Sequence, residues 1–161
     1  MGGPMKEKHI LHPVGVIHSP YKTKDAAPIQ GIFRSDVTGW VEVFAKYAEG
    51  LRDIEMFSHL YLIYLLDRAG PVELVRPTLL DDTPHGIFSS RHPARPNYLG
   101  INIVRLTKRE FNRLEVSGLD IIDKTPLIDI KPYVPRFDSF PDAGEGWFTG
   151  KQDRAKPAGR E

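Results

Sequence analysis

Apolar and polar residues alternate along several short stretches of the chain, each about as long as a β-strand. Residues 39–44 (GWVEVF) show this best, because the two valines face one side and the tryptophan and glutamate the other. Residues 9–19 are rich in β-branched side chains, and the glycine and proline among them indicate an edge strand. Both stretches are predicted to be strands.

A nearly continuous apolar and aromatic run covers residues 57–66 (FSHLYLIYLL). Its length and its tyrosine and isoleucine content predict a buried strand rather than a helix. Residues 46–53 are expected to form one short helix, and further short strands are predicted at 86–90, 100–106, 112–117 and 127–130. Short strands separated by turns, with few short helices, favour an all-β fold, either a barrel or a sandwich.

The glycine spacing argues against a doubly wound, nucleotide-binding sheet. The only Gly-x-Gly is Gly144-Glu145-Gly146, near the end of the chain, with no room for a following βαβ unit. Three parts of the chain are expected: a flexible N-terminal tail at 1–8, one barrel domain at 9–138, and an irregular C-terminal segment and tail at 139–161.

Composition narrows the classes of protein without selecting one. The 161 residues fit one domain with a single core, and 40% of them are hydrophobic. A net charge of +1 is unlike that of a protein that coats nucleic acid, so any RNA contact must come from a local patch. No apolar run is long enough to cross a membrane, and the N-terminus lacks a secretory signal, so a cytoplasmic protein without a membrane partner is expected.

Metal and nucleophile chemistry find little support. The chain has no cysteine, which removes disulfides and thiolate ligands. His9 and His12 have a metal-like spacing but no third ligand nearby, so no metal is expected. Neither a phosphate-binding G-x-x-x-x-G-K-[ST] loop nor a G-x-S-x-G elbow is present.

Two polar loops carry the candidate chemistry. In residues 86–100 (GIFSSRHPARPNYLG), prolines stiffen a loop that holds Arg91 and Arg95, an arrangement suited to anion or nucleotide binding. In residues 118–133 (GLDIIDKTPLIDIKPY), Asp120 and Asp123 precede a turn and can accept hydrogen bonds from ribose hydroxyls or a cationic amino group. The residues alone leave simpler alternatives open: solvated arginines on a surface loop, and aspartates that bond to their own backbone.

Four segments together closely resemble the TsaA-like, or TrmO, family of transfer RNA methyltransferases. They are GVIHSPY at 15–21, IEMFSHLYLIY at 54–64, SSRHPARPNYLG at 89–100 and LDIIDKTPLIDIKPY at 119–133, in the order expected for the family. The resemblance covers about 14–138. It implies a single-sheeted β-barrel that binds S-adenosylmethionine and forms a homodimer with the cofactor near the subunit interface. It also implies methylation of N6 of threonylcarbamoyladenosine, beside the anticodon of tRNA.

The resemblance also assigns site residues. Those implied to bind the cofactor are Pro28, Gln30, Asp67, Arg68, Arg91, Asn97, Leu119, Asp120, Asp123 and Thr125. Bacterial members have His-Gln where this chain has Asp67-Arg68. We expect Arg91 to bind the methionine carboxylate, and Asp123 either to accept from ribose or to act as the catalytic base.

RNA contacts are expected from a second set of residues. Arg95, Lys131 and Arg136 are candidates for phosphate contacts, and Tyr98 or Tyr133 for stacking on a base. Two other functions remain open at this point. One is an S-adenosylmethionine-dependent methyltransferase with another substrate, and the other is a non-enzymatic barrel that binds a ligand or RNA.

Overall fold

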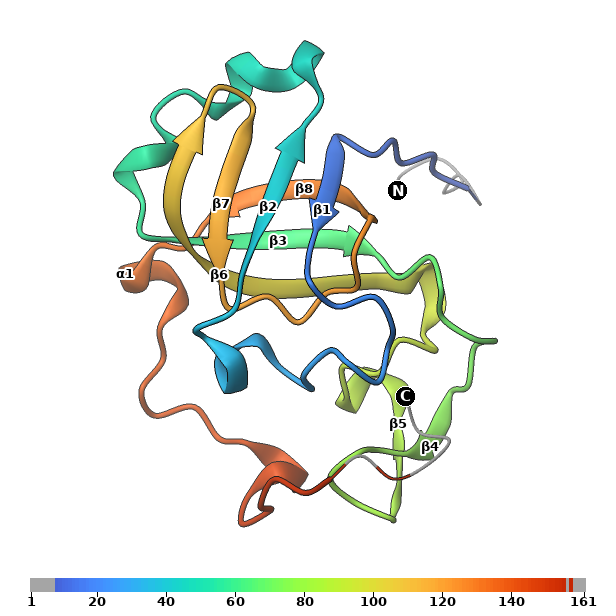
Figure 1. The fold of residues 1–161 in the computed structure, drawn as a ribbon. Helices are drawn as coiled ribbons and strands as arrows, with labels where there is room; N and C mark the ends of the chain where they lie inside the picture. Colours follow the sequence, from blue (N-terminus) through green and yellow to red (C-terminus); the bar gives the residue numbers. More distant parts are fainter. Residues whose placement is uncertain (1–7, 156, 158–161) are drawn as a thin grey trace, which may run out of the picture.

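The chain forms a closed barrel of six antiparallel strands, in the order β1-β2-β7-β6-β3-β8 (Figure 1). The computed structural model describes residues 8–155 and 157. The barrel strands are β1 (Gly15–His18), β2 (Thr38–Val43), β3 (His59–Leu65), β6 (Leu99–Glu110), β7 (Arg113–Ser117) and β8 (Thr125–Pro132). The predicted all-β fold is confirmed, and of the two architectures left open it is the barrel.

A small hairpin lies beside the barrel and was not predicted. It pairs β4 (Val75–Pro77) with β5 (Pro84–Gly86) and lies next to the C-terminal segment in Figure 1. The strand predicted at 86–90 is wrong, because β5 ends at Gly86 and a 3-10 turn follows. Three-residue strands that contain proline are too short to show an alternating pattern.

Helical segments are short throughout the described part of the chain. The only α-helix there is α1 (Pro135–Asp138), and the helix expected at 46–53 is the 3-10 segment η2 (Ala45–Leu51). The other 3-10 segments are η1 (Gly31–Arg34), η3 (Ile54–Met56), η4 (Ile87–Ser89), η5 (Pro96–Tyr98) and η6 (Gly146–Phe148). Loops therefore carry much of the chain outside the barrel.

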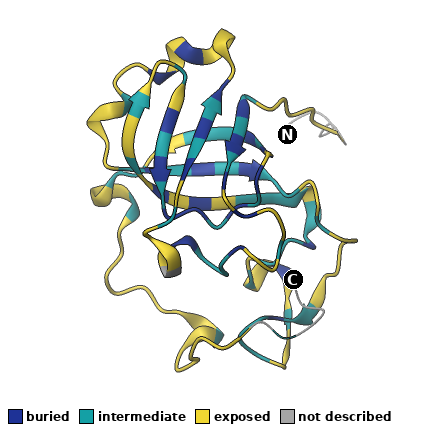
Figure 2. Ribbon diagram, viewed as in Figure 1, coloured by how far each residue is buried: buried dark blue, intermediate teal, exposed yellow. Residues whose placement is uncertain are grey.

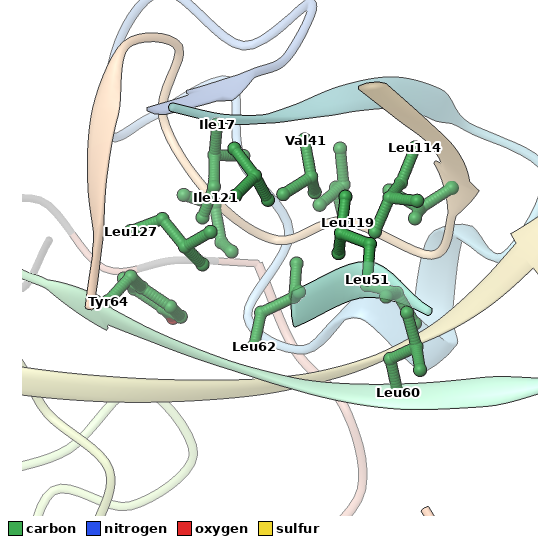
Figure 3. Close-up of a cluster of buried hydrophobic side chains, with 13 residues drawn as sticks. Ile17, Val41, Leu51, Leu60, Leu62, Tyr64, Leu114, Leu119, Ile121 and Leu127 are labelled. Carbon is green, nitrogen blue, oxygen red and sulfur yellow. The ribbon is translucent and has the colours of Figure 1, made fainter. Parts of the chain in front are cut away.

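The core fills the inside of the barrel. Side chains from opposite walls, including Ile17, Leu62 and Leu127, point toward one another in Figure 3. Burial alternates along β1, β2, β3 and β7, as the colours of Figure 2 show, and the predicted alternation of β2 is confirmed. Strand β3 confirms the strand predicted at 57–66, but only one of its faces is fully buried, and its outer residues are half-buried.

The strand predicted at 9–19 is shorter than expected and lies inside the sheet. Strand β1 begins at Gly15 and pairs with both β2 and β8, so it is not an edge strand. A Cβ atom at Gly15 would collide with the carbonyl of Glu42, so glycine allows this close approach. The predicted tail at 1–8 lies outside the described residues apart from Lys8, as do 156 and 158–161 of the predicted C-terminal tail.

Candidate functional site

A cavity of about 910 Å³ lies at one side of the barrel. Its walls come from the ends of β3 and β6, the loops at 24–30, 66–69, 78–80 and 90–95, the turn at 120–125 and the C-terminal residues 145–153. The cavity thus joins the loops in which the family resemblance placed the site. Seven of the predicted cofactor-binding residues line it: Pro28, Gln30, Asp67, Arg68, Arg91, Asp120 and Thr125.

The other three predicted cofactor-binding residues lie elsewhere. Leu119 is fully buried in the barrel core, and Asn97 is exposed in η5, where it adopts a left-handed backbone conformation with φ 66°. Asparagine tolerates that conformation better than most residues. Asp123 belongs to the turn at 120–125 but does not line the cavity.

Asp120 is the carboxylate of the turn at 120–125 that lines the cavity. Its Oδ2 accepts a hydrogen bond from the backbone N–H of Gly31 at 3.0 Å, and its Oδ1 accepts one from the Tyr64 hydroxyl at 3.4 Å. Burial raises the pKa of Asp120 to about 7, and these hydrogen bonds limit the rise. Near neutral pH this carboxyl group therefore populates both its neutral and its charged form.

The ring of Tyr64 packs directly against the backbone of Gly100. The ring of Tyr64 lies so close to Gly100 that a Cβ atom there would be 2.5 Å from the ring carbon Cζ. Burial, together with the nearby Asp120 carboxylate, raises the pKa of Tyr64 well above its ordinary value. The phenol therefore keeps its proton and remains a donor to Asp120.

Asn102, a residue that the sequence analysis did not single out, holds the backbone that carries Asp120. This buried residue of β6 faces the core, and its Oδ1 accepts from the backbone N–H of Asp120 at 3.1 Å. Its Nδ2 donates to the carbonyl of Gly118 at 3.2 Å. Gly118 in turn lies against Gly31, where a side chain would collide with the Gly118 carbonyl. The only hint of this role was that Asn102 shares the inward face of β6 with the apolar residues Val104 and Leu106.

Asp123 is paired within the protein. Its Oδ2 lies 2.6 Å from the ammonium of Lys22, and its Oδ1 accepts from the backbone N–H of Ser19 at 2.9 Å. The hydrogen bond from Lys22 is the main reason why the pKa of Asp123 is lowered. This carboxylate ties the turn at 120–125 to the loop after β1.

Two arginines border the cavity in different ways. Arg68 donates to the carbonyl of Asp123 at 2.7 Å and to the hydroxyl of Thr125 at 3.0 Å, so its guanidinium fixes the turn. Arg91 is exposed and donates through Nη1 to Oε1 of Gln30 at 2.6 Å. Because this bond uses a single N–H, the guanidinium keeps donors for an anionic group in the cavity.

The predicted RNA-binding residues do not form one group. Arg95 lines the cavity and donates to the carbonyl of Ser90 at 2.8 Å. Tyr98 is half-buried in η5, and Arg136 lies over the ring of Phe137 in α1. Lys131 pairs with Asp129 at 3.2 Å, and Tyr133 packs against Tyr61 with ring centroids 5.6 Å apart. Their part in RNA binding stays a prediction.

Two features are absent from the described residues, a metal-binding cluster and a membrane-spanning helix. Within 8–155 and 157, no group of three histidine, cysteine, aspartate or glutamate side chains is placed to hold a metal ion. In the same part of the chain, no helix has the length and apolar character needed to cross a membrane.

Most of the cavity walls belong to a stretch that matches a known family. Residues 16–139 match the family described as tRNA-methyltransferase O N-terminal domain. The chain belongs to the tRNA-methyltransferase O family. The family resemblance read from the four sequence segments is therefore confirmed.

Individual relatives agree with this assignment. A probable S-adenosyl-L-methionine-binding protein of Pyrococcus abyssi is 46% identical over 151 residues, covering 92% of this chain and 82% of that protein. The tRNA (adenine(37)-N6)-methyltransferase of Escherichia coli (strain K12) is 35% identical over 144 residues, covering 83% of this chain and 61% of that enzyme. A crystal structure of TrmO superposes with a TM-score of 0.77 at 37% identity, covering 87% of this chain and 64% of that one. The chain thus spans a little under two thirds of the Escherichia coli enzyme and of the TrmO chain in that crystal structure.

Proposed function

We propose that this protein transfers a methyl group from S-adenosylmethionine to N6 of threonylcarbamoyladenosine next to the anticodon of tRNA. The observation that carries the proposal is the cavity, which brings seven residues from four separated segments of a tRNA-methyltransferase O chain to one place. The names of relatives support both the cofactor and the adenosine substrate. The proposal also places the protein in the cytoplasm, where it would meet its tRNA substrate.

The cavity suits the cofactor in size and in chemistry. Its volume of about 910 Å³ falls in the usual range for small-molecule sites, about 300–1,000 Å³. Arg91 offers a planar set of donors for the methionine carboxylate, and Asp67 offers a carboxylate for the amino group or the ribose. Aliphatic walls that include Ile63 and Leu65 suit an adenine ring.

The chemistry asks the protein for orientation and for removal of one proton. When bound, S-adenosylmethionine supplies a methyl group on a positively charged sulfur, which leaves as a neutral thioether. The N6 nitrogen of the acceptor carries a hydrogen, and its lone pair is withdrawn by the neighbouring carbonyl. As the N–CH3 bond forms, the proton leaves N6 for a base, and the loss is easiest if that base titrates near the working pH.

Asp120 fits the role of base better than Asp123, the residue predicted from the sequence. Asp120 faces the cavity, and its pKa of about 7 suits proton transfer at neutral pH. Asp123 is held by Lys22, which favours its charged form and makes it a poorer proton acceptor. We therefore assign proton acceptance to Asp120 and a structural role to Asp123.

A homodimer is part of the proposal. Ile101 and Ile103, on the outer face of β6, are 43% and 46% exposed, and they pair across the sheet with Ile63 and Tyr61. Ile63 and Ile101 also line the cavity, so a second subunit on this apolar face would cover one rim of the site. Light scattering should give the mass of two chains for the native protein and of one chain for Ile103→Asp.

Transfer of labelled methyl groups tests the function directly. Labelled S-adenosylmethionine is incubated with the protein and with two preparations of one tRNA, one carrying threonylcarbamoyladenosine and one lacking it. We expect label only in the first RNA, and little with Asp120→Asn. Equal labelling of both RNAs would point to a different methylated base. Tight cofactor binding without label in either would favour a binding protein instead.

A further inference from the structure

Residues 145–154 lie against the cavity although they follow the stretch that matches the family. Glu145, Trp147, Phe148 and Lys151 from this segment line the cavity, whereas the family match ends at residue 139. Figure 1 shows the segment, coloured red, beside the β4–β5 hairpin. The C-terminal segment therefore adds a wall that the family motifs do not include.

Trp147 anchors this wall to the loop that carries Arg91. Its indole Nε1 donates to the carbonyl of Ser89 at 2.8 Å. The ring stacks on His85 with centroids 4.1 Å apart and an interplanar angle of 11°, and Phe148 stacks on it at 4.0 Å. Three stacked rings thus join β5 to the C-terminal segment, and Trp147 and Phe148 both line the cavity.

Charged contacts fasten the segment at its other end. Lys151 lies 3.2 Å from the Asp81 carboxylate, which also lies 3.1 Å from Nε2 of His85. Arg154 donates to the carbonyl of Leu79 at 2.7 Å and to Asp82 at 2.9 Å. The contacts on both sides of Lys151 hold the segment along the loop at 79–85.

We propose that residues 145–154 form a clasp, positioned by Trp147, that walls the cofactor cavity and sets how long the cofactor stays bound. This inference rests on the proposed function, because it takes S-adenosylmethionine as the occupant of the cavity. Trp147 is a positioning residue. Its ring faces are occupied by His85 and Phe148, and it acts by holding Phe148 and Lys151 at the cavity.

The test compares dissociation of labelled S-adenosylmethionine, chased with unlabelled cofactor, from the full-length protein and three variants. Trp147→Ala loses two stacked ring pairs, with His85 and Phe148, and one hydrogen bond, so dissociation should be about 10- to 1,000-fold faster. Trp147→Phe keeps an aromatic ring and should recover part of the loss. Phe140→Ala is the matched control, because Phe140 is exposed in the same part of the chain and does not line the cavity.

A second readout separates this role from general damage. A clasp that holds the cofactor equally in ground and transition states should leave kcat at saturating cofactor nearly unchanged in Trp147→Ala. Dissociation as slow as in the native protein, or a large fall in saturated kcat, would overturn the clasp while leaving the proposed function intact. If the native protein does not bind S-adenosylmethionine, the proposed function fails, and the clasp fails with it.

Discussion

Replacing Asp120 with asparagine should stabilise the protein at alkaline pH and leave its stability nearly unchanged at acid pH. Burial raises the pKa of this carboxyl from an ordinary value of 3.8 to about 7. Between these values the folded protein holds a proton that the unfolded chain has released, so stability falls as the pH rises through that window. Each pH unit of the window corresponds to about 1.4 kcal/mol, so the full cost of ionising Asp120 is roughly 4 kcal/mol.

Asparagine avoids this cost because it does not ionise. Its single carbonyl oxygen keeps one of the two accepted hydrogen bonds, from Gly31 or from Tyr64, and the lost bond costs about 1 kcal/mol. The Asp120→Asn protein should therefore be more stable than the native protein by about 3 kcal/mol at pH 8, and slightly less stable near pH 4.

Urea unfolding of both proteins from pH 4 to pH 8 measures this difference. Other carboxylates whose pKa values are shifted, such as Asp123, titrate in both proteins and cancel in the comparison. If the difference in unfolding free energy between the two proteins stays constant from pH 4 to pH 8, the pKa of Asp120 is not raised by burial. If the variant is less stable than the native protein at pH 8, the stabilisation from the hydrogen bonds of Asp120 exceeds the cost of burying its charge.

Three further predictions concern the site. Asp120→Asn should lower the single-turnover rate about 100- to 10,000-fold and leave cofactor affinity little changed. The rate of the native protein should rise toward pH 7 and then level off, as the Asp120 carboxyl loses its proton. A full rate in the variant would end the assignment of Asp120 as the base. Arg91→Ala should weaken cofactor binding about 10- to 150-fold in calorimetry and leave kcat nearly intact; an unchanged dissociation constant would place the carboxylate elsewhere. Gly100→Ala should push the Tyr64 ring off Asp120 and cost about 1–3 kcal/mol in urea unfolding, whereas Gly144→Ala, which meets nothing within 4 Å, should be neutral. Equal effects of the two alanines would contradict the contact.

The strands of the barrel were predictable where one face of a strand is buried. Residues 39–44 alternate because inward valines pack in the core while the outward residues meet solvent. The β4–β5 hairpin and the place of β1 inside the sheet were not predictable. The hairpin strands have three residues each, and closing the barrel depends on pairing β1 with β8, more than 100 residues apart. Local patterns carry no information about such a pairing.

The site was predictable only as a set of segments. Family motifs pointed to Arg91 and Asp120, which the fold brings to one cavity. They did not show which of the two aspartates faces it, because that depends on the pairing of Asp123 with Lys22, 101 residues away in sequence. Tyr64 and Asn102 were missed because each lies among apolar residues on the inward face of its strand and acquires its polar role only through contact with the turn at 118–120.

Mass spectrometry of nucleosides tests the central claim most directly. A tRNA that carries threonylcarbamoyladenosine is incubated with the protein and S-adenosylmethionine, digested to nucleosides and compared with the same RNA treated with the Asp120→Asn variant. The account predicts that threonylcarbamoyladenosine is replaced by a product heavier by one CH2 unit, as expected when a methyl group replaces a hydrogen, and that fragmentation places the methyl group on N6. Unchanged threonylcarbamoyladenosine alongside a protein saturated with cofactor, or a methyl group on another nucleoside, would contradict it.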